Sequence, residues 1–563
     1  MLGAENIIDF FHANGASFFT FPGGTIAPLY DALLQRGIAV FTARHEQGAG
    51  YAALAKSRLL QEPQVVMVTS GPGVTNILSV VADAYFDGTP LIVLTGQVGT
   101  ADLQSGRPVR QRGFQEVDTP AIVSSVCKHC YQVTDPETLP SVLVDAYALS
   151  MSGRRGPVVI DLPMNVQRAE VHCSAAEVPA PTEGQLPHQQ VQEAVESLSV
   201  SERPVILAGQ GVLQSGGLLA FRKLVHQHNI PVVSSLLGLG CMPGDSPLNV
   251  GFVGHTGVQV AGQVLQEADF VLVLGARLDV RQTGTCVDDF CRHARKILRV
   301  DIDAGELSAP RVRTDGVILG DVKHFLNVLS AALPTPTGLV LNARGQWLAR
   351  IETWKQQNTT DAHEDLSPKT VVQFLDKVTA GKDVVLTTGV GSHQHWAARH
   401  FTFDWPKRVL LTSGGHGTMG YDVPSAVGAA LTYPDRTILC IVGDASFQMN
   451  IQELQSIRDH NLNIKIIVLD NGRMALVSQF QQLTWGSDPT TGNVLNPDFV
   501  AIAQAYGIDA VTVENAEALP GTQDLLLSNK PALLHCRITP HADVLPMLLA
   551  GQKLDAMHHG DIQ

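Results

Sequence analysis

The sequence predicts an α/β fold made of three doubly wound parallel-sheet domains. Short apolar runs typical of buried strands alternate with helical spacing of apolar residues, and the alternation occurs three times along the 563 residues. Hydrophobic residues make up 45% of the chain, enough for several buried cores. The 51 glycines and 31 prolines suit the many turns that such an alternation needs. A chain of this length accommodates three domains of about 150 residues each.

Two polar, proline-containing stretches, 171–190 and 333–338, separate the three blocks of strands. The predicted domains are therefore 1–171, 190–332 and 365–540, with a C-terminal tail that reaches residue 563. The expected strands are 18–21, 38–41, 65–69, 91–95 and 158–161 in the first domain, 205–208, 232–234, 270–274 and 297–300 in the second, and 438–442, 464–469 and 532–537 in the third. Helical spacing is expected over 4–14, 257–268, 347–354 and 447–460.

Charge and composition exclude several classes of function. The 39 Lys and Arg residues against 53 Asp and Glu give a net charge of −14, which is unsuited to a nucleic-acid surface. No apolar run is long enough to span a membrane, and the segment after Met1 does not resemble a signal or transit peptide. Eight scattered cysteines match no disulfide framework, which favours a reducing compartment. We expect a cytoplasmic protein that binds neither nucleic acid nor membranes.

The third domain carries the strongest chemical signal. Asp444 follows one predicted strand, and Asn471 follows the next. The carboxyl ends of parallel strands meet at one edge of a sheet, so the oxygens of these two side chains can converge there. Mg²⁺ prefers such oxygen donors and completes its octahedron with phosphate oxygens and water. Taken alone, the Gly-Asp and Asn-Gly pairs are equally typical of ordinary turns.

Glu46 is the candidate catalytic carboxyl of the first domain. It stands between a predicted strand and a helix rich in alanine and glycine, a composition that permits close helix packing. A carboxyl in a dry interface keeps a proton-sharing contact that solvent would weaken. The helix dipole also explains an isolated Glu at a helix start. The glycines on either side of Pro72 form a tight loop that can approach a ligand closely, which favours the catalytic interpretation.

Several segments together resemble the catalytic subunit of acetohydroxyacid (acetolactate) synthase, a family of thiamine-diphosphate-dependent enzymes. The matching segments, in chain order, are 21–24, 44–50, 70–76, 113–118, 415–420, 443–454 and 544–547. The resemblance implies a pyrimidine-binding, a central FAD-binding and a diphosphate-binding domain. It also implies a homodimer at minimum, often paired into tetramers, in which Glu46 serves the cofactor held by the third domain of the other subunit. The sequence gives no signal for or against a regulatory small subunit.

The resemblance also assigns residues to thiamine diphosphate and Mg²⁺. Glu46 would relay a proton at the pyrimidine ring, and Gln115 would lie near the reacting centre. The expected Mg²⁺ ligands are the side chains of Asp444 and Asn471 and the carbonyl of Arg473. The expected thiamine diphosphate contacts are Gly73, Gly391, His393, Gln394, Gly417, Met419, Ala445, Ser446 and Met474. The expected substrate pocket is formed by Val390, Leu476, Val477 and Phe480.

The central domain resembles the FAD-binding part of the same family. The expected FAD contacts are Arg154, His255, Thr256, Gly257, Gly275, Arg277, Asp301, Asp303 and Asp321. Helix N-termini and backbone amides suit a pyrophosphate, and acidic side chains after strands suit ribose hydroxyls. In this family FAD is mainly structural, so its presence implies no redox turnover. Arg277 is also suited to a substrate carboxylate, because a guanidinium matches its geometry.

Four features depart from the family pattern, and three of them are single residues. Ser478 and Phe480 stand where Arg and Trp are usual, and Ala445 stands where Gly is usual. In the family that Trp helps to select a larger 2-ketoacid, and Phe is smaller and lacks the indole donor. The fourth is the loop 99–113, which is longer than in the family and either forms a solvated surface or meets an anionic acceptor. Its arginines are Arg107, Arg110 and Arg112.

The resemblance implies a C–C bond-forming transferase that decarboxylates pyruvate and transfers the acetaldehyde unit to a second carbonyl. The leading expectation is a 2-ketoacid acceptor, which gives 2-acetolactate from two pyruvates. The alternative keeps pyruvate as donor and uses a keto-sugar nucleotide or a ketone as acceptor. An FAD-dependent oxidase is disfavoured by the synthase-like motifs. An inactive binding homologue is disfavoured because Glu46, Asp444 and Asn471 are intact.

Overall fold

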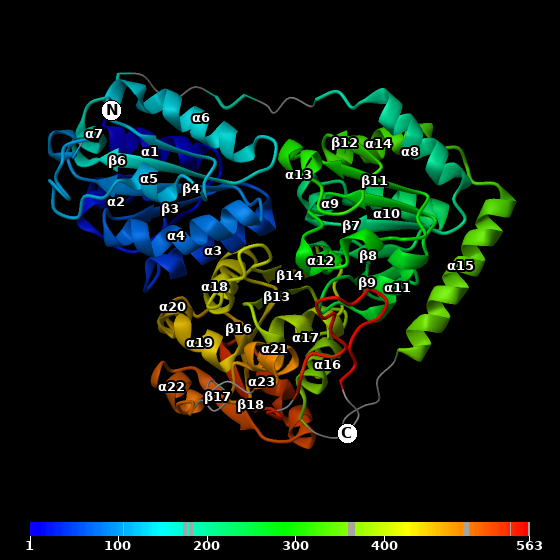
Figure 1. The fold of residues 1–563 in the computed structure, drawn as a ribbon. Helices are drawn as coiled ribbons and strands as arrows, with labels where there is room; N and C mark the ends of the chain where they lie inside the picture. Colours follow the sequence, from blue (N-terminus) through cyan, green and yellow to red (C-terminus); the bar gives the residue numbers. More distant parts are fainter. Residues whose placement is uncertain are drawn as a thin grey trace.

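The computed structural model describes residues 1–104, 106–172, 177–179, 184–358, 366–487, 495–540 and 542–560. These residues form three six-stranded sheets whose strand pairs are all parallel. Helices lie against the sheets in three separate units (Figure 1). The predicted α/β fold with three doubly wound sheets is therefore confirmed. Part of the predicted linker 171–190, residue 365 and the tail end 561–563 lie outside the described residues.

The first sheet has the strand order β2-β1-β3-β4-β6-β5. Its strands are β1 (Phe18–Thr20), β2 (Val40–Thr42), β3 (Gln64–Val68), β4 (Leu91–Gln97), β5 (His129–Gln132) and β6 (Pro157–Pro163). Its helices are α1 (Gly3–Ala13), α2 (Ala27–Gln35), α3 (Glu46–Leu60), α4 (Pro72–Phe86), α5 (Thr119–Val123), α6 (Leu139–Met151) and α7 (Met164–Arg168), with 3₁₀ turns η1 (Gly24–Ile26), η2 (Thr100–Asp102) and η3 (Pro136–Thr138). Both β3 and β4 are buried along their whole length, because helices cover both faces.

The central sheet has the order β12-β11-β10-β7-β8-β9. Its strands are β7 (Pro204–Ala208), β8 (Val232–Ser234), β9 (Asn249–Phe252), β10 (Phe270–Leu274), β11 (Lys296–Asp301) and β12 (Gly316–Leu319). Its helices are α8 (His188–Val200), α9 (Gln210–Gln214), α10 (Leu218–His228), α11 (Gln259–Glu267), α12 (Val280–Thr283), α13 (Ala304–Ser308) and α14 (Val322–Ala332), with η4 (Leu236–Gly238) and η5 (Val287–Asp289). The long helix α15 (Gly338–Gln357) follows along the outer side of this unit (Figure 1).

The third sheet has the order β14-β13-β15-β16-β18-β17. Its strands are β13 (Val384–Thr388), β14 (Arg408–Thr412), β15 (Thr437–Gly443), β16 (Ile464–Asp470), β17 (Asp509–Val513) and β18 (Ala532–Arg537). Its helices are α16 (Pro368–Val378), α17 (Ser392–His400), α18 (Asp422–Thr432), α19 (Asp444–Met449), α20 (Leu454–Asp459), α21 (Ala475–Trp485), α22 (Phe499–Ala505) and α23 (Gln523–Leu527), with η6 (Ile451–Glu453) and η8 (Ala516–Thr522). None of the described helices is long and apolar enough to cross a membrane.

The continuous helix expected over 447–460 is wrong. The structure has the two short helices α19 and α20, with a 3₁₀ turn between them. Asn450 leaves the helical region with a φ of −134°, and its side-chain amide donates to the carbonyl of Gly420 at 2.7 Å. Asn side chains compete with helical hydrogen bonding, and here the competing partner comes from a distant loop.

Helices α3 and α18 join the first and third domains within one chain, and Figure 1 shows them side by side. A Cβ atom on Gly428 would lie 2.1 Å from the carbonyl oxygen of Ala52, so only glycine permits this approach. Gly48 is equally close to Glu453, whose carboxylate accepts from the backbone N–H of Arg44 at 3.0 Å. The close packing expected from the alanine and glycine run of α3 is confirmed.

Candidate active site

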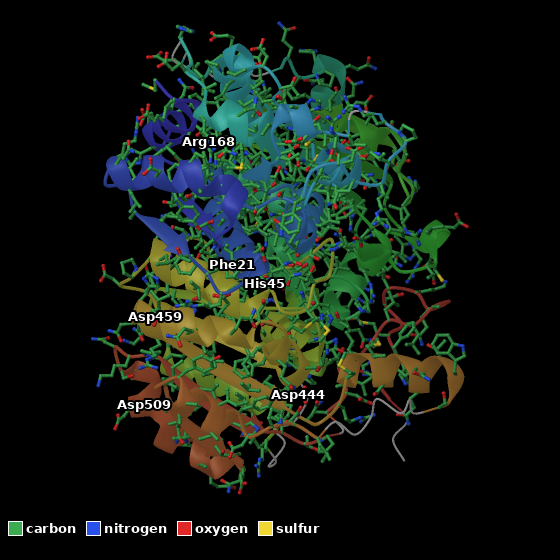
Figure 2. All side chains as sticks on the ribbon, turned by 90° about the vertical axis from the view of Figure 1, so that its left-hand side faces the viewer. Phe21, His45, Arg168, Asp444, Asp459 and Asp509 are labelled. Carbon is green, nitrogen blue, oxygen red and sulfur yellow. The ribbon has the colours of Figure 1, made fainter. Side chains whose placement is uncertain are left out.

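The carboxyl edge of the third sheet brings oxygen donors together, as the sequence predicts. β15 and β16 are neighbouring parallel strands, so Asp444 after β15 and Asn471 after β16 lie at the same edge. Asp444 starts α19 and is buried (labelled in Figure 2). Asn471 Oδ1 accepts from the backbone N–H of Arg473 at 3.1 Å, which stabilises the turn after β16.

Asn496 is a residue of this edge that the sequence analysis missed. Its side-chain amide donates to Asp444 Oδ2 and to Asp470 Oδ1, both at 2.7 Å. Asp470 also accepts from His535 Nε2 at 2.7 Å and from the backbone N–H of Gly472 at 3.0 Å. Asn496 lies 52 residues beyond Asp444, and no local pattern marks it. Asp470, by contrast, is the last residue of β16 and directly precedes Asn471, so its position at a strand end could have marked it as a site residue.

The two carboxyls at this edge have opposite pKa shifts. Burial raises the pKa of Asp444 to about 6, and the charge of Asp470 adds to the effect, although N–H groups of Asn496 and Ala445 oppose it. Burial acts on Asp470 in the same direction, but hydrogen bonds from His535 and Asn496 outweigh it and lower its pKa. A divalent cation at Asp444 would favour the ionised form and offset the burial.

The donor set suits Mg²⁺. The expected ligands are a carboxylate, an amide oxygen and a backbone carbonyl, which are the hard oxygen donors that Mg²⁺ accepts. No group of three or more His, Cys, Asp and Glu side chains that could hold a metal occurs in the described ranges. A cation at this edge therefore depends on the amide and carbonyl oxygens beside Asp444, and on oxygens from a bound ligand.

A cradle for an anionic group lies beside the cation site, around His393. A Cβ atom would lie 2.8 Å from the imidazole if placed on Gly391 and 3.0 Å from it if placed on Gly443, so both glycines are needed for the close approach. His393 Nε2 is buried and has no hydrogen-bond partner, and burial lowers its pKa to about 4. Gly391 is also the N-cap of α17, whose free N–H groups favour an anion.

Ser446 and Asp422 form the floor of this cradle. Ser446 Oγ donates to Asp422 Oδ2 at 2.6 Å and accepts from the backbone N–H of Gly420 at 2.8 Å. Asp422 is fully buried, and burial raises its pKa to about 6. The hydroxyl therefore ties the start of α18 to the start of α19, and Ala445 lies next to it. A methyl group at Ala445 is accommodated there without displacing these contacts.

The loop 413–420 lines part of a large cavity next to this cradle. We call it the pyrimidine loop, because the resemblance assigns Gly417 and Met419 to contacts with the cofactor's heterocyclic part. Gln394, at the start of α17, donates its side-chain amide to Thr412 Oγ1 at 2.7 Å and to the carbonyl of Ser413 at 3.2 Å. Gly417 has a φ of +81°, and a Cβ atom there would meet nothing within 4 Å, so this residue faces open space. Met419 is half-buried near the end of the loop.

Glu46 is buried at the start of α3, with 5% exposure. Asn76 in α4 donates its side-chain amide to Glu46 Oε2 at 3.0 Å, and His45 Nε2 lies 3.8 Å away. Gly73, in the turn before Asn76, is buried against Thr69. Figure 2 shows His45, next to Glu46, where the first and third domains meet and well apart from Asp444. The recorded polar contacts of Glu46 thus stay within its own domain.

Gln115 lies against the Gly71 turn with a strained backbone. Its φ is +62°, and a Cβ atom on Gly71 would lie 2.9 Å from the carbonyl oxygen of Gln115. Glu116 shapes the loop before it by accepting from the backbone N–H groups of Gln104, Arg112 and Gly113. Although burial opposes the effect, these hydrogen bonds lower the pKa of Glu116. The side chains of Arg107, Arg110 and Arg112 are exposed.

The expected substrate residues lie on and beside α21. Val390 and Leu476 line a large cavity, whereas Val477 and Phe480 are 52% and 48% exposed on the outer face of the helix. The ring of Phe480 contacts the ring of Trp485 edge to face, with 6.0 Å between centroids. Met474 is half-buried and precedes the helix.

The large cavity has a volume of about 1210 Å³ and lies between all three domains. That volume exceeds the range of about 300–1,000 Å³ typical of drug-sized ligands and suits a dinucleotide. Seven expected FAD contacts line it, namely Arg154, His255, Thr256, Gly275, Arg277, Asp301 and Asp321. Gly211 and Gly275 approach so closely that a Cβ atom on Gly275 would lie 2.5 Å from Gly211 Cα. Val390, Gln394 and Gly417 line its other end.

Two expected FAD contacts do not line the cavity. Gly257 is surrounded by backbone, and its carbonyl accepts from Arg399 at 3.1 Å. Asp303 caps α13 by accepting from the backbone N–H of Gly305 at 2.9 Å. Arg277, which does line it, forms an ion pair with Asp279.

Comparisons with known proteins identify the family of the three domains. The chain matches the N-terminal TPP-binding, central and C-terminal TPP-binding domains of thiamine pyrophosphate enzymes over residues 1–122, 191–329 and 389–536. It is 36% identical to the acetolactate synthase large subunit of Lactococcus lactis, over 96% of this chain and 92% of the relative. It is 35% identical to the acetolactate synthase isozyme 2 large subunit of Escherichia coli, over 98% of each chain. It is 34% identical to the mitochondrial acetolactate synthase catalytic subunit of Saccharomyces cerevisiae, over 96% of this chain and 81% of the relative.

Proposed function

This chain belongs to the acetolactate synthase family of thiamine-diphosphate-dependent enzymes, and we propose that it forms 2-acetolactate from two pyruvates. One pyruvate loses CO₂, its remaining two-carbon unit bonds to the keto carbon of the second pyruvate, and one proton is taken up. The enzyme is a transferase that forms a C–C bond. The observation that carries the proposal is the pairing of Asp444 and Asn471 with the His393 cradle at one sheet edge.

Thiamine diphosphate, when bound, supplies a carbon nucleophile for the pyruvate carbonyl and an electron sink for the decarboxylation. We assign its diphosphate to the His393 cradle and Mg²⁺ to Asp444, Asn471 and the carbonyl of Arg473. The unpartnered His393 Nε2 supports this assignment, because a buried polar atom without a partner is costly unless a ligand satisfies it. Gly417 and Met419 of the pyrimidine loop would contact the heterocyclic part.

Glu46 holds a proton for the pyrimidine nitrogen in this proposal. The hydrogen bond from Asn76 fixes one carboxylate oxygen and leaves the other for that nitrogen. Because the recorded polar contacts of Glu46 stay within its own domain, we propose that it faces the third domain of a second copy of the chain. The minimum functional unit is then a homodimer with two shared active sites.

Water must be excluded from the reacting centre, since stray protonation there would release acetaldehyde instead of acetolactate. Leu476 and Val390 provide apolar walls, and we propose that Phe480, which is exposed on α21, contacts the acceptor. We propose that Gln115, which packs against Gly71, orients the acceptor carbonyl. FAD is proposed for the large cavity, where it would hold the three domains together without redox turnover.

The test is NMR of the purified protein incubated with pyruvate, thiamine diphosphate, Mg²⁺ and FAD, without any other acceptor. Rapid accumulation of chiral 2-acetolactate supports the proposal. Slow CO₂ release with little acetolactate would contradict pyruvate as the acceptor and direct attention to other carbonyl compounds. Absence of any pyruvate consumption would contradict the whole assignment.

A further inference from the structure

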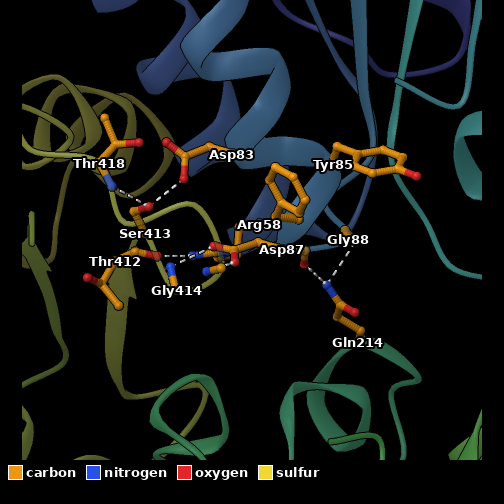
Figure 3. Close-up of polar contacts among 12 residues, drawn as sticks. Arg58, Asp83, Tyr85, Asp87, Gly88, Gln214, Thr412, Ser413, Gly414 and Thr418 are labelled. Carbon is orange, nitrogen blue, oxygen red and sulfur yellow. Dashed lines mark hydrogen bonds and ion pairs between the residues drawn. The ribbon is translucent and has the colours of Figure 1, made fainter. Parts of the chain in front are cut away.

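The C-terminal end of α4 clamps the pyrimidine loop from the side of the first domain of the same chain (Figure 3). The Ser413 hydroxyl donates to Asp83 Oδ1 and accepts from the backbone N–H groups of Gly417 and Thr418, both at 2.9 Å. One hydroxyl thus connects a carboxylate of the first domain to two amides of a loop in the third domain. Ser413 is 1% exposed, so water does not compete for these hydrogen bonds.

Asp87, the C-cap residue of α4, holds the beginning of the same loop. Its carboxylate accepts from the backbone N–H of Gly414 at 3.0 Å and of Gly415 at 2.7 Å. Arg58 of α3 bridges Asp87 at 2.6 Å and donates to the carbonyl of Thr412 at 2.6 Å. Side chains of the first domain therefore satisfy the backbone polar groups at the start of the loop, and Asp83, together with the Tyr51 hydroxyl near Thr418, faces its far part.

The burial of Asp83 argues against a purely stabilising role. The residue is fully buried, and its Oδ2 accepts no hydrogen bond of normal geometry, although the hydroxyls of Tyr51 and Thr418 face the carboxyl. A buried carboxyl with one unsatisfied oxygen costs free energy, and a well-packed apolar side chain at the same place would often be more stable. The contact that Asp83 does make is directed at the loop conformation, through Ser413.

We propose that Asp83 is a positioning residue, which through Ser413 holds the amides of Gly417 and Thr418 in the loop conformation that binds thiamine diphosphate. This inference rests on the proposed function, because it concerns the loop assigned to that cofactor. Asp83 touches neither the cofactor nor the substrate. It acts on binding by keeping the loop in one conformation before the cofactor arrives, which lowers the entropic cost of binding.

The groups that face Asp83 make its action depend on pH. Burial raises the pKa of Asp83 to about 6, the charge of Asp87 adds to this, and the Ser413 and Thr418 hydroxyls and His416 oppose it. Tyr51 and Arg58 of α3 and Tyr421 at the start of α18 also face this cluster. A charged carboxylate accepts a stronger hydrogen bond than a neutral carboxyl. Asp83 therefore holds Ser413 firmly above about pH 6 and more weakly below it.

The experiment compares wild-type protein with Asp83→Asn, Ser413→Ala and the double variant, all as full-length chains. The dissociation constant for thiamine diphosphate is measured at saturating Mg²⁺ by quenching of intrinsic fluorescence. Hydrogen exchange of the segment 413–418 is measured on the cofactor-free proteins. Asp269→Asn is the matched control, because Asp269 is also buried and accepts from Ser201 Oγ and two backbone N–H groups far from the loop.

We expect each single variant to bind about tenfold more weakly, and the double variant no more weakly than the weaker single one. Hydrogen exchange of the backbone amides of 413–418 should be faster in Asp83→Asn and in Ser413→Ala than in wild type. The control Asp269→Asn should bind thiamine diphosphate with wild-type affinity. The tenfold difference between Asp83→Asn and wild type should shrink below about pH 6, where wild-type Asp83 is itself neutral. Titration of the cofactor phosphates affects both proteins equally at a given pH, so it does not change the ratio of their dissociation constants.

The outcomes separate the inference from the proposed function. Failure of wild-type protein to bind thiamine diphosphate overturns the function and the inference together. Tight binding by wild type with unchanged affinity in Asp83→Asn overturns the inference alone. Fully additive losses in the double variant also overturn it, because Asp83 would then not act through Ser413. If Asp83→Asn does not fold, wild-type affinity and wild-type exchange in Ser413→Ala, which removes one atom, overturn it.

Discussion

At the residue scale, Asp444 occupies a position where its charge is costly without a cation. Its pKa of about 6 is above the value of an unfolded Asp, so its ionisation destabilises the cofactor-free fold progressively as the pH rises from about 4 to above 6. We expect Asp444→Asn to raise the free energy of unfolding of the cofactor-free protein at pH 8, by roughly 1–2 kcal/mol. Urea unfolding of both proteins at pH 8 measures this difference in the free energy of unfolding, and the difference should vanish at pH 4.

The same substitution should reverse its effect when Mg²⁺ and thiamine diphosphate are present. Wild-type protein gains stability from binding, and Asp444→Asn should lose most of that gain because one ligand charge is missing. Wild-type stabilisation by Mg²⁺ and cofactor in the variant would contradict the assignment of Asp444 as a metal ligand.

Glu46→Gln tests the proposed catalytic role of the Glu46 carboxyl. Gln keeps the shape and the contact with Asn76 but cannot exchange a proton, so kcat should fall by about 10²–10⁴-fold while cofactor affinity changes little. Steady-state acetolactate formation and fluorescence titration measure the two quantities. Glu517→Gln, an exposed residue in η8, is the matched control and should retain full turnover. Unchanged turnover in Glu46→Gln would rule out the proton-relay role.

Phe480→Trp tests the acceptor side. The resemblance implies Trp at this position, and the larger ring would add contact area for a longer 2-ketoacid. When pyruvate and 2-ketobutyrate compete as acceptors, the variant should shift the product ratio toward 2-ketobutyrate by about fivefold or more. Product ratios by NMR measure this. An unchanged ratio would place Phe480 outside the acceptor pocket.

At the scale of elements, the crossing of α3 and α18 depends on glycine at position 428. A Cβ atom there would lie 2.1 Å from the carbonyl oxygen of Ala52, and this backbone cannot move aside as a side chain could. Gly428→Ala should lower the free energy of unfolding by about 1–3 kcal/mol despite the better helix propensity of alanine. In Gly345→Ala, within α15, the added Cβ meets nothing within 4 Å, and the variant should gain about 0.5–1 kcal/mol. Equal effects of both substitutions in denaturant unfolding would contradict the close crossing.

Uniform burial made most of the central strands predictable from sequence, although β13, which is also buried along its whole length, was not predicted. β7, β10 and β15 are apolar runs because helices cover both faces, and their positions agree with the expected strands. The edge strands β5, β12 and β17 have mixed exposure and were not predicted. The break between α19 and α20 depends on the contact of Asn450 with Gly420, which is distant in sequence and leaves no local pattern.

The residues of the candidate site also fall into those that local sequence patterns predict and those that only the fold reveals. Asp444, Asn471 and Glu46 stand at the ends of predictable strands, so their place at sheet edges followed from sequence. Asn496 and Asp83 act over long sequence separations, and only the fold brings them to the site. The resemblance to a family named further residues but not these two.

At the scale of the whole molecule, the account requires that two copies of the chain build each active site. Within one chain, His45, which directly precedes Glu46 in the sequence, lies apart from Asp444 (Figure 2). An active site with both groups therefore needs Glu46 from one copy and Asp444 from another. The large cavity, in contrast, is lined by residues of all three domains of a single chain, so FAD binding should need no second copy.

The most direct measurement is complementation between Glu46→Gln and Asp444→Asn, each inactive alone. Unfolded together in equal amounts and refolded, half of the dimers should be mixed, and each mixed dimer should contain one site with both wild-type residues. The account predicts acetolactate formation at about a quarter of the wild-type rate. An inactive mixture, despite mixed dimers shown by native mass spectrometry, would contradict the shared active site.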